Sequence, residues 1–118
     1  MYRCRFRKQM RLLNRKDFNY VFLNPKRIAF KELVLLSRKN DTFQHSRIGI
    51  IISKKNIKKS NERNRIKRLV RETFRISQNI LLVPMDHVLI IKKSSMDLDN
   101  SKLMNLLKKL WKTNYLLK

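Results

Sequence analysis

The sequence predicts an α+β fold in which helices cover a small mixed sheet. Apolar runs of strand length occur at residues 33–38, 47–53 and 86–92, and amphipathic helical patterns stand before, between and after them. A helix between two consecutive strands indicates a parallel pair in an otherwise antiparallel sheet. With 118 residues, 42% of them hydrophobic, the chain has enough apolar material for one core, so we expect residues 1–118 to form a single domain.

The amino-terminal segment, residues 1–13, is basic and is expected to be extended. Asn14 is a candidate N-cap for a first helix, and Pro25 would end that helix. Asp17 would lie in the first turn, where a carboxylate suits the helix dipole. The apolar positions of this helix fall on one face: Phe18, Val21 and Phe22.

Three strands are expected, with a further short strand allowed before residue 33. The run at 47–53 is almost continuously apolar, which indicates that both of its faces are at least partly covered. Gly49, the one glycine of the chain, lies inside it and predicts a bulge or the close approach of another group. Residues 93–98 are expected to form a loop. Asp99 or Asn100 would then cap a last helix whose apolar positions are Leu103, Leu106, Leu107, Leu110 and Trp111.

Residues 61–75 predict a helix with one buried face and an arginine-rich outer face. Ser60 or Asn61 is the candidate N-cap, and the pattern fades at residues 78–82. The apolar positions follow helical spacing and are Ile66, Leu69, Val70 and Phe74. The cations on the rest of the wheel are Arg63, Arg65, Lys67, Arg68, Arg71 and Arg75. Guanidinium groups suit a polyphosphate, because they are planar, bidentate and permanently charged.

The charge balance points to a polyanionic partner. The chain has 30 Lys and Arg residues and only eight Asp and Glu residues, which gives a net charge of +22 spread along the whole chain. Nucleic acid is the leading candidate. An anionic membrane is disfavoured, because the apolar runs are too short to span it and no long amphipathic helix is expected. A single cysteine, Cys4, allows no internal disulfide and fits a reducing, cytoplasmic setting. The scattered carboxylates indicate no two-metal nuclease site.

One segment carries a family resemblance. Ser-Lys-Lys at residues 53–55, followed by Glu-Arg-Asn-Arg-Ile-Lys-Arg-Leu-Val-Arg-Glu-Thr-Phe-Arg at 62–75, closely resembles the signature of the protein subunit of bacterial ribonuclease P. The resemblance extends over nearly the whole chain, through Arg11-Leu12, Asp17-Phe18, Val21-Phe22, Arg47-Ile48-Gly49, Asp86 and Lys92-Lys93. The chain departs from the pattern at residues 56–62, where many members carry a Gly-x-Ala-Val stretch and this connection is longer and more basic.

The resemblance implies a two-layer α/β sandwich of the ribosomal protein S5 domain 2-like type, with a left-handed β-α-β crossover. Periodicity alone favours the right-handed default. It also implies a ribonucleoprotein whose RNA subunit, with Mg²⁺ bound mainly by that RNA, removes the 5′ leader of precursor tRNA. This chain would contribute no catalytic residue, no metal ligand and no organic cofactor. Its partners would be the catalytic RNA and precursor tRNA, with no membrane and no obligate protein partner.

The resemblance assigns two sets of binding residues. The set expected to bind catalytic RNA is Arg63, Asn64, Arg65, Lys67, Arg68 and Arg71. The set expected to bind the single-stranded leader is Phe18, Phe22, Ser53, Lys54, Lys55 and Lys92.

Each set has a structural alternative. From the residues alone, aromatics four apart on a helix are more often core than binding site, and the resemblance raises the binding interpretation. Ser53 is equally suited to a turn or capping role. Glu72 either orients Arg68 or forms an ordinary surface pair. The arginine-rich face could also be only a solvated basic surface.

A different class of protein also explains the charge. A small ribosomal or RNA-assembly protein would coat structured RNA without any role in cleavage. That reading does not account for the match at residues 53–75 or for the ordered matches on either side of it.

Overall fold

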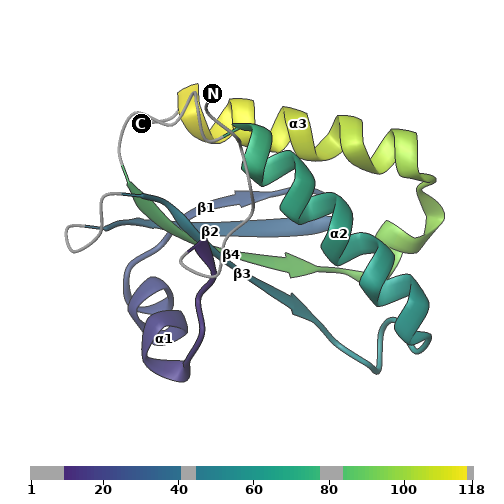
Figure 1. Ribbon diagram of the computed structural model, residues 1–118, viewed down its shortest axis with the longest axis horizontal. Helices are drawn as coiled ribbons and strands as arrows, with labels where there is room; N and C mark the ends of the chain where they lie inside the picture. The colour runs from purple at the N-terminus through teal and green to yellow at the C-terminus, as the bar shows by residue number, and fades with distance from the viewer. Residues whose placement is uncertain (1–9, 41–44, 78–83, 117–118) are drawn as a thin grey trace, which may run out of the picture.

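The computed structural model describes residues 10–40, 45–77 and 84–116 (Figure 1). The expected order of helices and strands is present, and the short strand before residue 33 exists as β1. The elements are α1 (Arg15–Leu23), β1 (Lys26–Ala29), β2 (Leu33–Lys39), β3 (Arg47–Ile52), α2 (Ser60–Ser77), β4 (Met85–Ile91), the 3-10 helix η3 (Lys93–Asp97) and α3 (Asn100–Leu116).

The described strands form one mixed sheet in the order β1-β2-β4-β3. β2 is antiparallel to both β1 and β4. β3 and β4 are parallel, with Gly49 opposite Val88. The parallel pair is the one that α2 connects, so the α+β prediction is confirmed.

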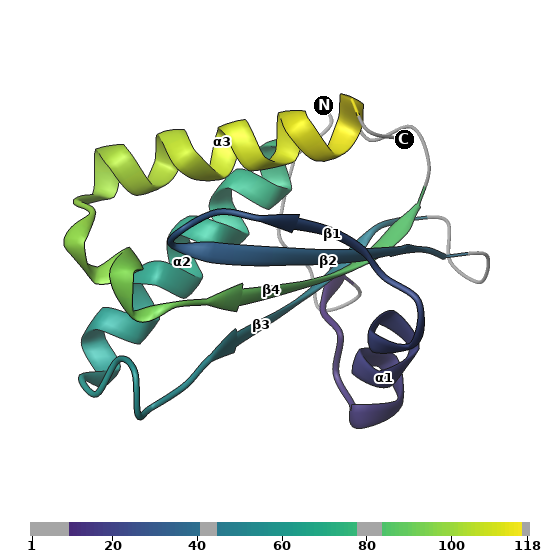
Figure 2. The same cartoon turned by 180° about the vertical axis from the view of Figure 1, so that it is seen from behind.

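The connection from β3 through α2 to β4 is left-handed. In Figure 1 both strands point to the right, α2 lies in front of them, and β4 lies above β3 at their carboxyl ends. Turned so that the strands point upward, the view places β4 to the left of β3 with the helix toward the viewer. Figure 2 shows the reverse side, with β1 and β2 in front of α2. The handedness implied by the resemblance is therefore confirmed, and the right-handed default is wrong here.

The main core lies between the sheet and the layer formed by α2 and α3 (Figure 1). Alternate residues of β2, β3 and β4 point into it, as the period of two in a strand requires. The predicted apolar faces of both helices are confirmed. The fully buried side chains here include Leu33, Leu35, Ile66, Val70, Phe74, Leu89, Leu103, Leu107, Leu110 and Trp111. Burial of a large apolar side chain contributes about 1.5–3 kcal/mol, so this layer dominates the stability.

Helix α1 packs on the opposite face of the sheet (Figure 2). A smaller apolar cluster joins it to the strands, with Leu12, Val21, Val34, Leu36 and Val88 buried. Phe18, Tyr20, Ile51 and Ile90 are only partly buried around that cluster. We call this side of the sheet, from α1 across Ile51 and Ile90 to the ends of β3 and β4, the α1 face.

Several local signals behave as the sequence predicts. Asn14 caps α1, because its Oδ1 accepts a hydrogen bond from the backbone N–H of Asp17 at 3.0 Å. Asp99 caps α3 in the same way, through Lys102 N–H at 2.8 Å. Helix α2 begins at Ser60, so Ser60 and Asn61 are both helical residues and the predicted N-cap at one of them is wrong. The predicted end of that helix at residues 78–82 lies outside the described residues, as do residues 1–9 of the basic amino-terminal segment.

The prediction of a loop at residues 93–98 is wrong in one respect, because residues 93–97 form the 3-10 helix η3. Both the backbone N–H and the hydroxyl of Ser95 donate to the carbonyl of Lys92, at 3.1 and 2.7 Å. Leu98 N–H then donates to Ser95 O at 3.2 Å. These bonds wind the segment into a short helix that carries no apolar periodicity in its sequence.

Candidate nucleic-acid interface

The six residues expected to bind catalytic RNA all lie on α2, but they do not share one surface. Ile66, Leu69, Val70 and Phe74 are buried, and this fixes the rotation of the helix. The members of the set then differ in exposure: Asn64 and Arg68 are exposed, whereas Arg63, Arg65, Lys67 and Arg71 are partly buried. Lys67 and Arg71 reach toward β3, while Arg65 reaches toward α3.

Arg63 fastens the connection between β3 and α2. Its Nη1 donates to the carbonyls of Ile57 and Lys58, both at 2.8 Å. A guanidinium has five N–H donors, so these two bonds leave others available. The resemblance implies only an RNA-binding role for Arg63, and the sequence gives no signal for these bonds within the protein.

Arg65 joins α2 to α3. Its Nη1 donates to Asn100 Oδ1 at 2.7 Å, and its Nε and Nη2 donate to Glu62 Oε2 at 3.3 and 3.2 Å. The side chain is 19% exposed. Because its three nitrogens are all engaged within the protein, Arg65 is held in a fixed orientation between α2 and α3.

Glu72 pairs with Arg75, not with Arg68. The interpretation in which Glu72 orients Arg68 is therefore wrong. Both carboxylates of α2, Glu62 and Glu72, are engaged with an arginine three residues further on. Neither carboxylate pairs with Arg68, which is exposed.

A hollow of about 140 Å³ brings residues of both predicted sets together. Its lining includes Phe18 of α1, Gly49 of β3, and Lys67 and Arg71 of α2. Arg11 also lines it. Burial lowers the pKa of Arg71, and the nearby charge of Arg11 lowers it further. An anion placed here would oppose both effects, because a nearby negative charge favours the cationic form of Arg71.

Gly49 explains how Phe18 reaches this hollow. A Cβ built on Gly49 would lie 2.5 Å from Cε1 of the Phe18 ring and 3.2 Å from Leu12 Cβ. The ring therefore lies directly on the backbone of β3. The prediction that this glycine permits a close approach is confirmed, and the approaching group is an aromatic of the leader-binding set.

The remaining residues expected to bind the leader follow the α1 face toward the ends of β3 and β4. Phe22 lies one turn beyond Phe18 and is 43% exposed, which does not fit a core residue. Ser53 and Lys92 come just after the paired residues Ile52 and Ile91. Strand alternation places Gly49, Ile51 and Ser53 on the same side as Val88, Ile90 and Lys92. Aromatic rings and cations thus lie at opposite ends of one partly buried sheet surface.

A tight turn follows β3 and presents two lysines. Ser53 Oγ accepts a hydrogen bond from Lys55 N–H at 3.1 Å, so Ser53 has the turn role that its sequence allowed. Lys54 and Lys55 are exposed on this turn. Lys92 Nζ donates to Phe30 O at 3.2 Å, which directs that ammonium toward the β1–β2 hairpin. The cations are therefore spread across the edge of the sheet.

A buried ion-pair network fixes α1 against the sheet. Asp86, 1% exposed, accepts from Arg47 Nε at 3.0 Å, from Arg47 Nη2 at 2.7 Å and from Asn40 Nδ2 at 2.8 Å. Arg47 Nη1 lies 3.4 Å from Asp17 Oδ2 in α1. Hydrogen bonding to Asp86 is the main cause that raises the pKa of Arg47, against the opposing effect of burial. The sequence analysis did not predict this network. The available signal was a charged residue near the start of each of two buried strands, Arg47 in β3 and Asp86 in β4.

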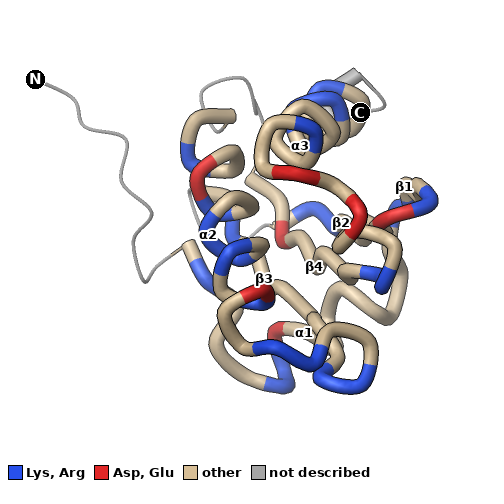
Figure 3. Tube along the Cα trace, turned by 90° about the vertical axis from the view of Figure 1, so that its right-hand side faces the viewer, with Lys and Arg blue, Asp and Glu red and all other residues tan. Residues whose placement is uncertain are grey.

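Basic residues surround the molecule. Figure 3 shows Lys and Arg on all three α-helices and on β1, with far fewer acidic positions between them. Within residues 10–40, 45–77 and 84–116, no three His, Cys, Asp or Glu side chains gather where they could hold a metal ion. Over the same residues, no helix has the length and apolar content needed to cross a bilayer.

The comparisons with known proteins agree on one family. A family model described as Ribonuclease P matches residues 6–115. The chain belongs to the ribonuclease P protein family. A ribonuclease P protein component from Photorhabdus laumondii is 46% identical over 112 residues, which cover 95% of this chain and 92% of that one. One from Proteus mirabilis has the same identity and coverage.

Solved structures of family members share the fold. The RNase P protein of Staphylococcus aureus superimposes with a TM-score of 0.82 at 26% identity, covering 89% of this chain and 94% of that one. The RNase P protein from Thermotoga maritima gives a TM-score of 0.67 at 36% identity, covering 84% and 96%. The sequence resemblance and the fold expectation drawn from it are therefore both confirmed.

Proposed function

We propose that this chain is the protein subunit of ribonuclease P, and that it assists removal of the 5′ leader from precursor tRNA. In this proposal α2 binds the catalytic RNA, and the α1 face binds the leader. The observation that carries the proposal is the hollow in which Phe18 and Gly49 meet Lys67 and Arg71. It supports two RNA strands lying side by side on one small protein.

The outward side chains of α2 would neutralise phosphates of the catalytic RNA. Arg68 and Asn64 are exposed, and Lys67 and Arg71 extend the basic surface toward β3. Arg63 and Arg65 would offer their remaining donors while holding the connection and α3 in place. Neutralising backbone where catalytic RNA and substrate meet reduces the number of cations that must be recruited from solution. The holoenzyme would then need less Mg²⁺ for cleavage than the RNA alone.

The α1 face would hold the leader without reading its sequence. Phe18 and Phe22 offer ring surfaces to bases, and stacking of this kind contributes about 1–3 kcal/mol per base whatever the base. Lys54, Lys55 and Lys92, with the Ser53 turn, stand where the strand would leave the sheet. A precursor would then bind more tightly than mature tRNA, because only the precursor carries a leader.

The chemistry in this proposal belongs to the RNA subunit. Mg²⁺ would be bound mainly by that RNA and would activate the attacking water and stabilise the leaving oxygen. The protein would supply no catalytic residue, no metal ligand and no organic cofactor. We further propose that the whole chain acts as a single RNA-binding domain in the cytoplasm, without an obligate protein partner.

Two substitutions separate the two binding functions. Arg68→Ala should lower the salt slope of holoenzyme assembly by about one unit, because one phosphate contact is lost. Phe22→Ala should weaken precursor binding by about 1–3 kcal/mol and leave assembly unchanged. The matched controls are Lys112→Ala, an exposed cation on α3, and Leu23→Ala, an exposed apolar residue beside Phe22. An unchanged salt slope would contradict the α2 assignment, and equal losses for precursor and mature tRNA would contradict the leader assignment.

A further inference from the structure

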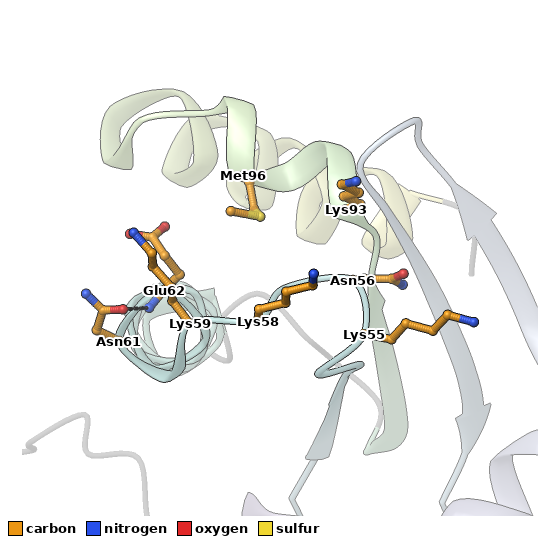
Figure 4. Close-up of a pocket in the computed structure, with 8 residues that line it drawn as sticks. All are labelled: Lys55, Asn56, Lys58, Lys59, Asn61, Glu62, Lys93 and Met96. Atoms are coloured by element: carbon orange, nitrogen blue, oxygen red, sulfur yellow. Dashed lines mark hydrogen bonds between the residues drawn. The ribbon is translucent and has the colours of Figure 1, made fainter.

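A second and larger hollow lies beyond the α1 face, between the β3–α2 connection and η3. Its volume is about 520 Å³, within the range of about 300–1,000 Å³ that is usual for small-ligand sites. Residues from both segments form its walls (Figure 4): Lys55, Asn56, Lys58, Lys59, Asn61, Glu62, Lys93 and Met96.

The walls of this hollow are held in place by the fold. On one side, Ile57 N–H donates to Ser53 O at 3.0 Å and the Ile57 side chain is fully buried in the core. The guanidinium of Arg63 binds the carbonyls of Ile57 and Lys58. Folding has therefore already ordered this wall, and binding a ligand here would cost little further conformational entropy.

The opposite wall is fixed in the same way. Ser95 binds the carbonyl of Lys92 and thereby closes η3, and Ser94 Oγ donates to Lys31 O at 2.9 Å. Met96 is carried on this short helix and is 39% exposed. In Figure 4 its side chain points toward the middle of the hollow. A large apolar side chain is thus presented to solvent from a rigid support.

The chemistry of the lining favours an anion with a flat apolar part. Four lysines line the hollow, and Glu62, the one carboxylate among the lining residues, already pairs with Arg65. In Figure 4 the Lys58 side chain lies across from Met96, so its aliphatic stem and the thioether bound a slot. Asn56 offers an amide that can both donate and accept hydrogen bonds. A nucleobase with its phosphate has this combination of shape, polarity and charge.

We infer that this hollow binds one unpaired nucleotide of the leader, with its base between Met96 and Lys58 and its phosphate among the lysines. The inference rests on the proposed function and names where the leader goes after it leaves the α1 face. From Gly49, under the Phe18 ring, to Ser53 is four strand residues, or about 13 Å. The hollow begins at once beyond that point, because Lys55 follows the end of β3 and Lys93 follows the end of β4.

The experiment compares the assembled holoenzyme on two precursors. One has a short leader that ends on the α1 face, and the other has a long leader that continues past Lys55. Lys58→Ala and Met96→Ala should each weaken binding of the long-leader precursor by about fivefold or more and leave the short-leader precursor unchanged. Lys102→Ala, an exposed lysine of α3 outside the hollow, is the matched control and should affect neither.

A third precursor separates base from phosphate. Abasic nucleotides in the distal part of the leader should weaken wild-type binding by the same factor as Met96→Ala, and the two changes together should cost no more than either alone. Equal losses on short and long leaders would overturn the inference, as would a loss of holoenzyme assembly, which would make catalytic RNA the occupant. Wild-type holoenzyme that fails to prefer precursor over mature tRNA would instead overturn the proposed function itself.

Discussion

Substitution of Gly49 by alanine tests the contact that joins α1 to β3. The new Cβ would lie 2.5 Å from the Phe18 ring, which no real contact sustains, and 3.2 Å from Leu12 Cβ. The ring must therefore move away from the strand. Because the atoms concerned are the far end of a side chain that is only partly buried, Phe18 can swing outward without unfolding α1.

The size of the effect follows from two opposing terms. Overpacking of this kind costs about 1–3 kcal/mol. Replacing a glycine inside a strand by alanine stabilises by about 0.5–1 kcal/mol, since the unfolded chain loses freedom. The net loss in the free energy of unfolding should therefore be between about 0 and about 2.5 kcal/mol. Precursor affinity should fall as much as it does in Phe18→Ala, because both changes remove the ring from the α1 face.

Urea unfolding of Gly49→Ala, Phe18→Ala and the double variant gives the coupling between the two positions. With the ring gone, Gly49→Ala should become neutral or stabilising, since the next nearest atom to the new Cβ is Leu12 Cβ, at 3.2 Å. If Gly49→Ala costs the same free energy with and without the ring, the Phe18 ring does not lie on Gly49 and the reasoning is refuted.

Three further substitutions test how the site is supported, each by urea unfolding. Asp86→Ala should cost about 3–5 kcal/mol, because it leaves Arg47 without its buried partner; a loss under 1 kcal/mol would contradict the network. Thr73→Val removes the acceptor, at 3.3 Å, for the indole N–H of Trp111 and should cost about 1–3 kcal/mol, whereas a neutral result would show that the bond contributes nothing. Asn14→Ala removes the α1 cap and should cost about 1 kcal/mol, with Asn14→Asp restoring most of it.

Periodicity predicted the elements and their buried faces well. The spacing of Ile66, Leu69, Val70 and Phe74 fixed which side of α2 is buried, and the apolar residues of α3 did the same. Caps at Asn14 and Asp99 were readable because they are local hydrogen bonds. The handedness of the β3–α2–β4 crossover could not be predicted from periodicity, because it depends on how the crossover packs and not on which residues are apolar.

The side-chain contacts within the candidate site could be identified only from the structure. Gly49 predicted the close approach of another group. The residues around Gly49 do not indicate which group approaches, because Phe18 is remote from it in sequence. Arg63 and Arg65 look like any other cations of the arginine-rich pattern, yet both also bind protein groups. The hollow beside Met96 arises because a connection and a 3-10 helix face each other. Such features depend on tertiary placement, which spacing along one segment does not encode.

We propose that this chain helps an RNA enzyme to act on precursor tRNA. The most direct test is a cleavage assay with precursor tRNA and bacterial ribonuclease P RNA at limiting Mg²⁺, with and without the chain. We predict that the chain restores removal of the 5′ leader and that the chain alone cuts nothing. Tight binding to the RNA with no change in cleavage would contradict it, and would favour a protein that only coats RNA.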